Sequence, residues 1–467
     1  MPTCTRPNVL LITTDQQRSD TLGVNGNTLV RTPNMDSLAR GGVNFQQAFV
    51  QNTVCIPSRA CIQTGRYTHQ HGVEYMEEVI DDTPGLPAWE ITFMERLQAA
   101  GYRTAAYGKL HMMPHKGFHE MHVCGGKGAR WIKSAGLDIG LGPLGRDYAA
   151  WLEARHPGAY EMIYQQRRQP EYEKYHTAIS NVLPLDEYVD TWIAQNTIDY
   201  LKRPHERPFF AWCGFCGPHD PMDPPSPYDK MYPYDDIPLH PNYNFDLDRR
   251  PRPTSPEEDA VVRRWMSHYF GQITLIDDAI GRIIDTLRAQ DLLKDTLIIL
   301  ASDHGEMMFE FGKRHKAQFN EGVIRVPLIV APPGAMDAKG TSAGRNVQDV
   351  VEIYDIAPTV LDYADAEVPS SMSASSLRPI IEGRGGGRQM ALSQYVTGDR
   401  KFRGVCVRTQ SAKYTRWTDS RGEEFYDIAA DPLERNNLID DPKHKAEIDR
   451  HRMLLIDRLT HTGAKMC

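Results

Sequence analysis

The sequence lacks the features that mark a disulfide scaffold, a nucleic-acid-binding protein or a membrane protein. Eight cysteines are scattered through 467 residues, too sparsely for a disulfide framework. No long basic run occurs and the formal net charge is −8, so we expect no nucleic-acid partner. The apolar run near the N-terminus, in RPNVLLITTDQ, is too short for a signal peptide or a membrane span. We therefore expect a cytoplasmic protein without membrane association, and we leave homo-oligomerisation open.

The hydrophobic pattern predicts an α/β fold. Short apolar, β-rich runs such as NVLLIT (8–13) alternate with segments that have helical spacing, such as residues 265–290. This alternation indicates a large, mostly parallel sheet with helices on both faces. After about residue 366 the pattern changes to three short strands and a last helix. We therefore predict an α/β domain over 1–365 and a small C-terminal α+β domain, with an antiparallel sheet, over 366–467.

Two stretches do not show this alternation. Residues 112–190 are rich in Gly, Tyr, Trp and Arg and read as irregular, and residues 204–256 are rich in proline. We expect both to form loops that shape a pocket beside the ends of the strands. Aromatic residues there, such as Trp131 and Trp151, are then candidates for setting substrate preference.

Polar side chains follow four of the predicted strands at their C-terminal ends. They are Asp15, the pair Lys109 and His111, His219, and the pair Asp303 and His304. In open parallel sheets this edge is where ligands bind. Two carboxylates and an imidazole are suitable ligands for one divalent cation. The carboxylates favour calcium or magnesium, and the histidine leaves room for manganese or zinc.

Cys55 lies at the start of a predicted short helix. Pro57 fits the first helical turn and Gly65 fits the helix end. Unpaired N–H groups and the helix dipole favour an anion at such an N-terminus. A buried structural cysteine and a nucleophile both fit this placement.

The order CIPSR (55–59), followed by TGR (64–66), resembles the C-x-P-S-R signature of the type I sulfatases, members of the alkaline phosphatase superfamily. Further blocks are similar to that family, in the family's order, over nearly the whole chain. They are NVLLITTDQQRSD, TPNMDSLARGGVNFQQAF, GYRTAAYGKLH, RPFFAWCGFCGPHDP, DTLIILASDHGE, KAQFNEGVIRVPLIV and EEFYDIAADPLERNNL.

The resemblance implies a sulfuric ester hydrolase that acts on a small sulfate ester. In this family a maturing enzyme oxidises the signature cysteine, here Cys55, to formylglycine, whose hydrate is the nucleophile. Asp15, Asp303 and His304 would hold one divalent metal together with residue 55. The resemblance favours calcium, with manganese or magnesium as alternatives.

The resemblance also implies roles for five other residues. Arg59 would steady the hydrate, and Lys109 and Lys316 would bind sulfate oxygens. His111 would polarise or deprotonate a hydroxyl of the hydrate, and His219 would protonate the leaving oxygen. A proton donor and fixed positive charges are the groups that cleavage of a sulfate ester requires.

The sequence departs from the commonest family pattern at three positions. Gln16 follows Asp15, His304 follows Asp303, and Val323 replaces a glycine. The first two changes also occur in choline sulfatases and in the related phosphonate monoester hydrolases, so the metal's identity stays open. Two alternatives to a sulfuric ester hydrolase are kept. One is a phosphonate monoester or phosphodiester hydrolase, and the other is a non-catalytic binding member of the family. The pair Lys109 and His111 argues against the first, and the full set of catalytic positions argues against the second.

Two further patterns carry less weight. WCGFC (212–216) imitates a thioredoxin active site, but Gly217 and Pro218 follow and cannot continue a helix, so we expect no redox function. His71, which follows the signature helix, is kept as a candidate pocket residue. The sequence does not distinguish an aryl, a choline or a sugar sulfate as substrate.

Overall fold

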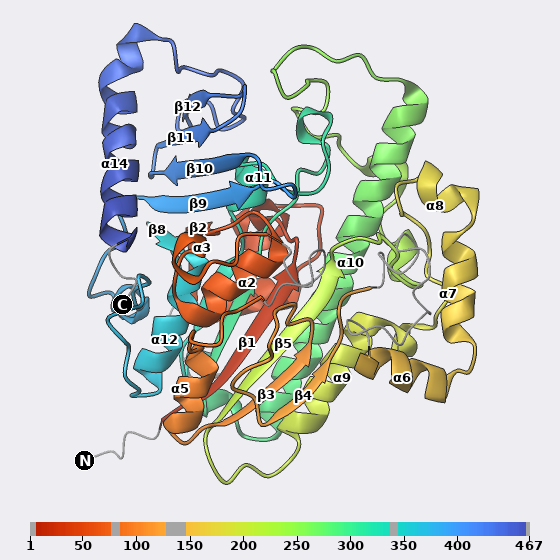
Figure 1. The fold of residues 1–467 in the computed structure, drawn as a ribbon. Helices are drawn as coiled ribbons and strands as arrows, with labels where there is room; N and C mark the ends of the chain where they lie inside the picture. Colours follow the sequence, from red (N-terminus) through yellow and green to blue (C-terminus); the bar gives the residue numbers. More distant parts are fainter. Residues whose placement is uncertain (1–5, 76–84, 128–145, 337–343, 464–467) are drawn as a thin grey trace.

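The computed structural model describes residues 6–75, 85–127, 146–336 and 344–463, which form two sheets and the helices around them (Figure 1). The larger sheet has the strand order β4-β3-β5-β1-β6-β7-β2-β8. Its strands are β1 (Asn8–Asp15), β2 (Val43–Phe49), β3 (Arg103–Gly108), β4 (Glu120–Val123), β5 (Phe209–Pro218), β6 (Thr296–Ser302), β7 (Leu328–Ala331) and β8 (Arg345–Glu352).

The large sheet is mostly parallel, as the sequence predicts. β1 lies near its centre and pairs in parallel with β5 and β6, and β7 alone runs antiparallel to both of its neighbours. The carboxyl ends of β1, β3, β5 and β6 therefore meet at one edge. β2 and β8 were not identified from the sequence, because VNFQQAF and RNVQDVVE carry polar residues among the apolar ones.

Alternate residues of β1 enter two separate cores. Val9 and Leu11 pack on one face of the sheet and Leu10 and Ile12 on the other. On the first face lie α2 (Cys55–Thr64), α3 (Thr68–His71), α5 (Phe93–Ala99), α12 (Ile356–Tyr363) and α13 (Arg378–Ile381). The helices on the second side are α1 (Pro33–Gly41), α6 (Arg146–Arg155), α7 (Ala159–Arg167), α8 (Pro170–Lys174), α9 (Val189–Leu201) and α10 (Pro256–Ala289). The predicted fold class is confirmed.

The expectation of irregular structure between 112 and 190 is wrong for its second half, where α6, α7 and α8 lie. These helices are short and mixed in polarity, which conceals a helical period. Trp151 stacks on Tyr148 and lies beside Trp192 of the second core, so it is a packing residue in this structure. Trp131 lies outside the described residues.

The proline-rich stretch is only partly the surface loop we expected. β5, the strand predicted before His219, occupies its first part as expected, and beyond β5 the side chains of Met222, Tyr232 and Ile237 are buried against α10. Proline prevents regular strands and helices here but does not prevent burial of the apolar side chains between the prolines.

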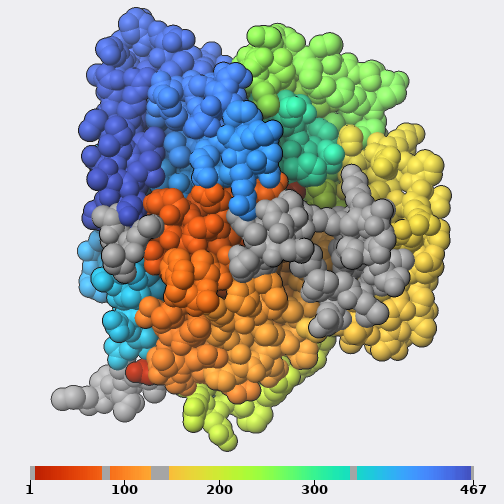
Figure 2. Space-filling model, in the orientation of Figure 1, coloured from red at the N-terminus to blue at the C-terminus, as the bar shows by residue number. Residues whose placement is uncertain are grey.

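The smaller sheet is antiparallel, in the order β12-β11-β10-β9. Its elements are β9 (Ala391–Val396), β10 (Arg403–Arg408), β11 (Ala412–Trp417), β12 (Glu423–Asp427) and the last helix, α14 (Lys445–Gly463). In Figure 2 this blue region lies directly against the orange segment that contains α2 and α3, and Tyr67 packs in its core. The domain boundary at 365/366 remains a prediction. No helix in the described part of the chain is long and apolar enough to cross a membrane.

Candidate active site

Cys55 is the first residue of α2, at the carboxyl edge of the large sheet. Val54 before it is extended, and Gly65 ends the helix in the left-handed conformation, with a φ of 64°. All ten residues of α2 are buried, and Cys55 is 1% exposed. The placement predicted from Pro57 and Gly65 is therefore confirmed, and the helix N-terminus favours an anion at Cys55.

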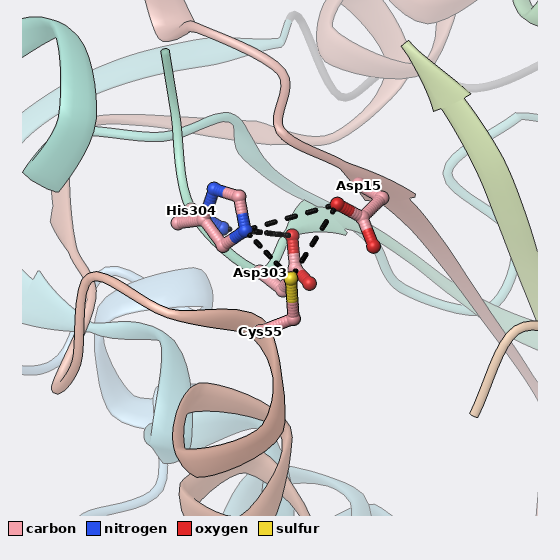
Figure 3. Close-up of side chains that lie close together, drawn as sticks. All are labelled: Asp15, Cys55, Asp303 and His304. Carbon is pink, nitrogen blue, oxygen red and sulfur yellow. Dashed lines mark hydrogen bonds and ion pairs between the residues drawn. The ribbon is translucent and has the colours of Figure 1, made fainter. Parts of the chain in front are cut away.

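Four side chains point toward one another at this edge (Figure 3). The Sγ of Cys55 lies 3.1 Å from His304 Nε2 and 3.9 Å from Asp15 Oδ1. His304 Nε2 lies 3.7 Å from one oxygen of Asp15 and 3.7 Å from one oxygen of Asp303. The potential ligand atoms all lie within 4.8 Å of one another, and all four residues are buried.

This donor set fits a divalent cation. Two carboxylates supply hard oxygen ligands, and His304 supplies a nitrogen. The Nδ1 of His304 lies 2.9 Å from the carbonyl oxygen of Gly305, a contact that turns Nε2 toward Cys55, as in metal-binding histidines. Among the described residues, Asp15, Cys55, Asp303 and His304 are the one group of this kind.

Arg59 lies behind the two carboxylates. Its Nε donates to Asp303 Oδ2 at 2.8 Å, and one terminal nitrogen lies 3.1 Å from Asp15 Oδ2. The other terminal nitrogen donates to the Lys109 carbonyl oxygen at 2.7 Å. The guanidinium thus fixes the outer oxygens of both carboxylates and leaves the inner oxygens facing Cys55. A direct contact between Arg59 and a hydrated residue 55 stays a prediction.

Two lysines face the same centre from different elements. Lys109, just after β3, places its Nζ 2.5 Å from Asp15 Oδ2. Lys316 places its Nζ 2.7 Å from Cys55 Sγ and 2.9 Å from His304 Nε2. Burial alone would raise the pKa of the Cys55 thiol, but Lys316, His304 and Lys109 bring that pKa well below its ordinary value. The site therefore stabilises negative charge at residue 55.

His111 follows β3 by three residues and His219 directly follows β5, and both rings lie close enough to Cys55 for it to affect their pKa. Burial and the charge of Lys109 lower the pKa of His111 to about 3, so His111 is neutral near pH 7. Burial and Lys316 also lower the pKa of His219, whose Nδ1 lies 2.9 Å from the Asp220 carbonyl oxygen. The structure thus brings the other eight predicted site residues together around Cys55.

Comparison with known families identifies the family of this chain. Residues 7–366 match the family model described as Sulfatase, and residues 307–461 match the model described as N-sulphoglucosamine sulphohydrolase, C-terminal. The chain belongs to the sulfatase family.

Individual relatives and solved structures match over nearly the whole chain. An arylsulfatase of Clostridium perfringens (strain 13 / Type A) is 31% identical over 491 residues, which cover 97% of this chain and 94% of that protein. The phosphonate monoester hydrolase structure of Agrobacterium radiobacter has a TM-score of 0.78 at 24% identity, covering 99% and 96% of the two chains. A structure in complex with D-glucosamine-2-N,6-O-disulfate has a TM-score of 0.77 at 21% identity, covering 98% and 99%. The two structural likenesses show a shared fold.

Some residues that support this candidate site were missed in the sequence. Ser58 of the signature donates its Oγ to the Asp303 carbonyl oxygen at 2.6 Å. Gln16 has a φ of 71°, and its N–H donates to Asp303 Oδ1 at 3.2 Å. The side chain of Gln16 donates to Glu306 Oε2 at 2.6 Å. Ser58 could have been found from its place in the signature, but nothing in the sequence pairs Gln16 with Glu306.

His71 is not a pocket residue. It is 1% exposed, its Nε2 lies 3.4 Å from Cys61 Sγ, and its Nδ1 accepts the N–H of Val73 at 3.1 Å. These contacts fix the chain after α2.

Proposed function

We propose that this protein hydrolyses a sulfate monoester, with residue 55 as the nucleophile after a maturing enzyme converts Cys55 to formylglycine. Family membership supports a hydrolase. The observation that carries the proposal is the pairing of a buried Cys55, at a helix N-terminus, with two lysines and a carboxylate–histidine group. The same surroundings suit a sulfate group held beside an oxygen nucleophile.

Asp15, Asp303, His304 and residue 55 would hold one divalent cation, for which calcium is the first candidate and magnesium or manganese the alternatives. Such a cation lowers the pKa of a hydroxyl bound to it and offsets negative charge on the group being transferred. Besides steadying the hydrate, Arg59 would keep the two carboxylates in place, because its guanidinium spans both.

His111 is suited to accept a proton from a hydroxyl of the hydrated residue 55, because it is neutral and lies near that residue. The hydroxyl oxygen then bonds to sulfur while the bond from sulfur to the leaving oxygen breaks. Lys109 and Lys316 bind the oxygens of the sulfate through this change, as fixed positive charges.

His219 is suited to protonate the leaving oxygen. In the structure its pKa lies below the ordinary value, because of burial and then Lys316. A sulfate ester bound beside it brings a negative charge that opposes the effect of Lys316 and favours the protonated ring. His219 is therefore most readily protonated when the substrate is bound.

Hydrolysis of a phosphonate monoester or phosphodiester is the second candidate. It is favoured by the sequence of the metal-binding group, in which Gln16 follows Asp15 and His304 follows Asp303. The presence of Lys109 and His111 near Cys55 favours the sulfatase.

Initial rates decide between the candidates. Protein co-expressed with a formylglycine-generating enzyme would be assayed on aryl, choline and sugar sulfates, on an aryl phosphate and on a phosphonate monoester, with Cys55→Ala as control. We expect the highest kcat/KM on a sulfate ester, and elemental analysis should find one divalent metal per active chain. A higher kcat/KM on the phosphonate monoester would replace the first candidate with the second.

A further inference from the structure

Lys316 faces residue 55 although it belongs to no helix or strand. It lies in the segment between the short turn η8 (Glu310–Gly312) and α11 (Glu321–Ile324), which appears beside β10 in Figure 1. Its four-carbon side chain has many rotamers, and their loss on ordering costs up to about 2 kcal/mol. A neighbouring structure must therefore hold this segment in place if the ammonium group is to stay 2.7 Å from Cys55 Sγ.

The backbone on both sides of Lys316 adopts a conformation that side chains disfavour. His315 has a φ of 69° and Ala317 a φ of 71°, and neither residue is glycine. The left-handed conformation costs roughly 1–2 kcal/mol for such a residue. Contacts elsewhere must offset this cost at both positions.

His315 makes three contacts that can do so. Its N–H donates to a carboxylate oxygen of Glu306, and its carbonyl oxygen accepts from the Met307 N–H at 2.8 Å. Any residue at position 315 could make these two backbone contacts. The third depends on the side chain: His315 Nδ1 lies 2.8 Å from Asp220 Oδ2.

Asp220 is the residue after His219 in sequence. It is 7% exposed, and its Oδ1 accepts a hydrogen bond from Thr177 Oγ1 at 3.1 Å. Its carbonyl oxygen lies 2.9 Å from His219 Nδ1. Asp220 thus contacts the ring of His219 through its backbone and the ring of His315 through its carboxylate. It joins the two loops that supply Lys316 and His219.

The contact between Asp220 and His315 is an ion pair. Burial alone would lower the pKa of His315, but Asp220 at 2.8 Å raises it above the ordinary histidine value. The His315 side chain is 47% exposed, and ion pairs at such positions contribute about 0–1 kcal/mol to stability. Stability alone does not account for a histidine in a left-handed conformation at this position.

We propose that His315 is a positioning residue, whose imidazole is held by Asp220 so that Lys316 stays directed at residue 55 and at a fixed separation from His219. The proposal rests on the proposed function, because it assigns His315 a part in holding the sulfate-binding lysine. His315 acts through its neighbours, and the reacting atoms are contacted by Lys316 and His219.

Two substitutions of His315 separate the side-chain contact from backbone strain. Glycine adopts a positive φ without cost, so His315→Gly removes the contact with Asp220 while relieving strain. Asparagine tolerates the same conformation and carries an amide N–H near the position of Nδ1, so His315→Asn retains a donor to Asp220. Ala317→Gly is the matched control, since it relieves strain on the other side of Lys316 and leaves Asp220 untouched.

We expect kcat to fall about 10–100-fold in His315→Gly, as for a displaced catalytic group, and to recover most of that loss in His315→Asn. Ala317→Gly should stay within about threefold of the wild type, and all three should melt near the wild-type temperature. Full activity in His315→Gly, or an Asn variant as slow as the Gly variant, would overturn the proposal. So would a loss of activity that simply follows the melting temperature.

Crystal structures of unconverted wild type and both His315 variants test the geometry without any substrate. We expect Lys316 to leave hydrogen-bonding distance of Cys55 in His315→Gly and to regain it in His315→Asn. An unmoved Lys316 in His315→Gly refutes the positioning role. These structures need no turnover, so they test the positioning role independently of the proposed function. If the converted wild type were inactive on every sulfate ester, the proposed function would be refuted, but the positioning role would still be decided by the position of Lys316.

Discussion

Buried charges are arranged differently at the carboxyl edge of the large sheet and in the small C-terminal sheet. Around Cys55 lie three cationic side chains but two carboxylates: Arg59 contacts both Asp15 and Asp303, and Lys109 contacts Asp15. The third, Lys316, faces Cys55 and His304.

In and beside the C-terminal sheet, buried cations have carboxylate partners of their own. Lys413 contacts Glu434, and each side chain is 2% exposed. Arg408 contacts both oxygens of Glu321, at 2.8 and 3.2 Å. Paired charges of this kind hold segments together. The excess of cations at Cys55 leaves positive charge that a bound anion would offset, whereas the ion pairs at the C-terminal sheet are already balanced.

Replacing Cys55 should give the largest effect. We expect Cys55→Ala to lower turnover of a sulfate ester about 10⁴-fold or more, because the nucleophile is lost. Thermal unfolding should change little, since alanine fills the first helical position without strain. Initial rates and a melting curve of the same preparation check both points. Substantial turnover by a folded Cys55→Ala protein would exclude residue 55 as the nucleophile.

Replacing His219 separates proton donation from sulfate binding. We expect His219→Ala to slow alkyl sulfates about 10²–10⁴-fold and nitrophenyl sulfate far less, because the nitrophenolate needs little protonation. Lys316→Ala should slow both kinds of substrate alike, since it binds oxygens common to them. The measurement is the slope of log kcat/KM against the pKa of the leaving group. A slope that His219→Ala leaves unchanged would end the proton-donor assignment.

The two kinds of buried lysine can be compared directly. We expect Lys109→Met to lower kcat about 10²–10³-fold, as for the loss of one charge-stabilising donor. Lys413→Met should instead reduce the free energy of unfolding by about 3–5 kcal/mol, because Glu434 is left buried and unpaired. Urea unfolding and kcat of the folded fraction, measured for both variants, test this contrast. Equal effects of the two variants on kcat would contradict it.

Replacing the buried His71 should give the smallest effect. Burial, and then Arg66 and His69, lower the pKa of His71 to about 3, below the ordinary histidine value. Below pH 6.5 the unfolded chain binds a proton at this residue and the folded chain does not, so folding stability falls as the pH falls toward 3. The loss due to His71 should reach about 2 kcal/mol between pH 6.5 and 5. Denaturation at several pH values should show a weaker acid dependence in His71→Gln. The same slope in both proteins would mean that His71 is not the group responsible.

The strands that carry the site could be predicted because they are buried on both faces. NVLLIT and TLIILAS are continuous apolar runs, and the polar residue that ends each one marks the edge of the sheet. Cys55 could be placed because Pro57 and Gly65 bound its helix. Local sequence was sufficient for these elements.

The remaining features depend on contacts between distant parts of the chain. Asp220 and His315 are far apart in sequence, and neither has a local pattern that indicates the other. The span of Arg59 across Asp15 and Asp303 likewise requires three elements to be in place. The helices between 146 and 174 were missed because their polarity is mixed and their burial is set by the neighbouring α9.

The central claim is that residue 55 of the active protein is formylglycine. Peptide mass spectrometry of protein co-expressed with a maturing enzyme measures this directly, alongside the specific activity of the same preparation on a sulfate ester. We expect the peptide that contains residue 55 to show the mass loss for replacement of CH₂–SH by an aldehyde, in a fraction that rises in proportion to activity. Full activity in protein that carries only unmodified Cys55 would contradict the account.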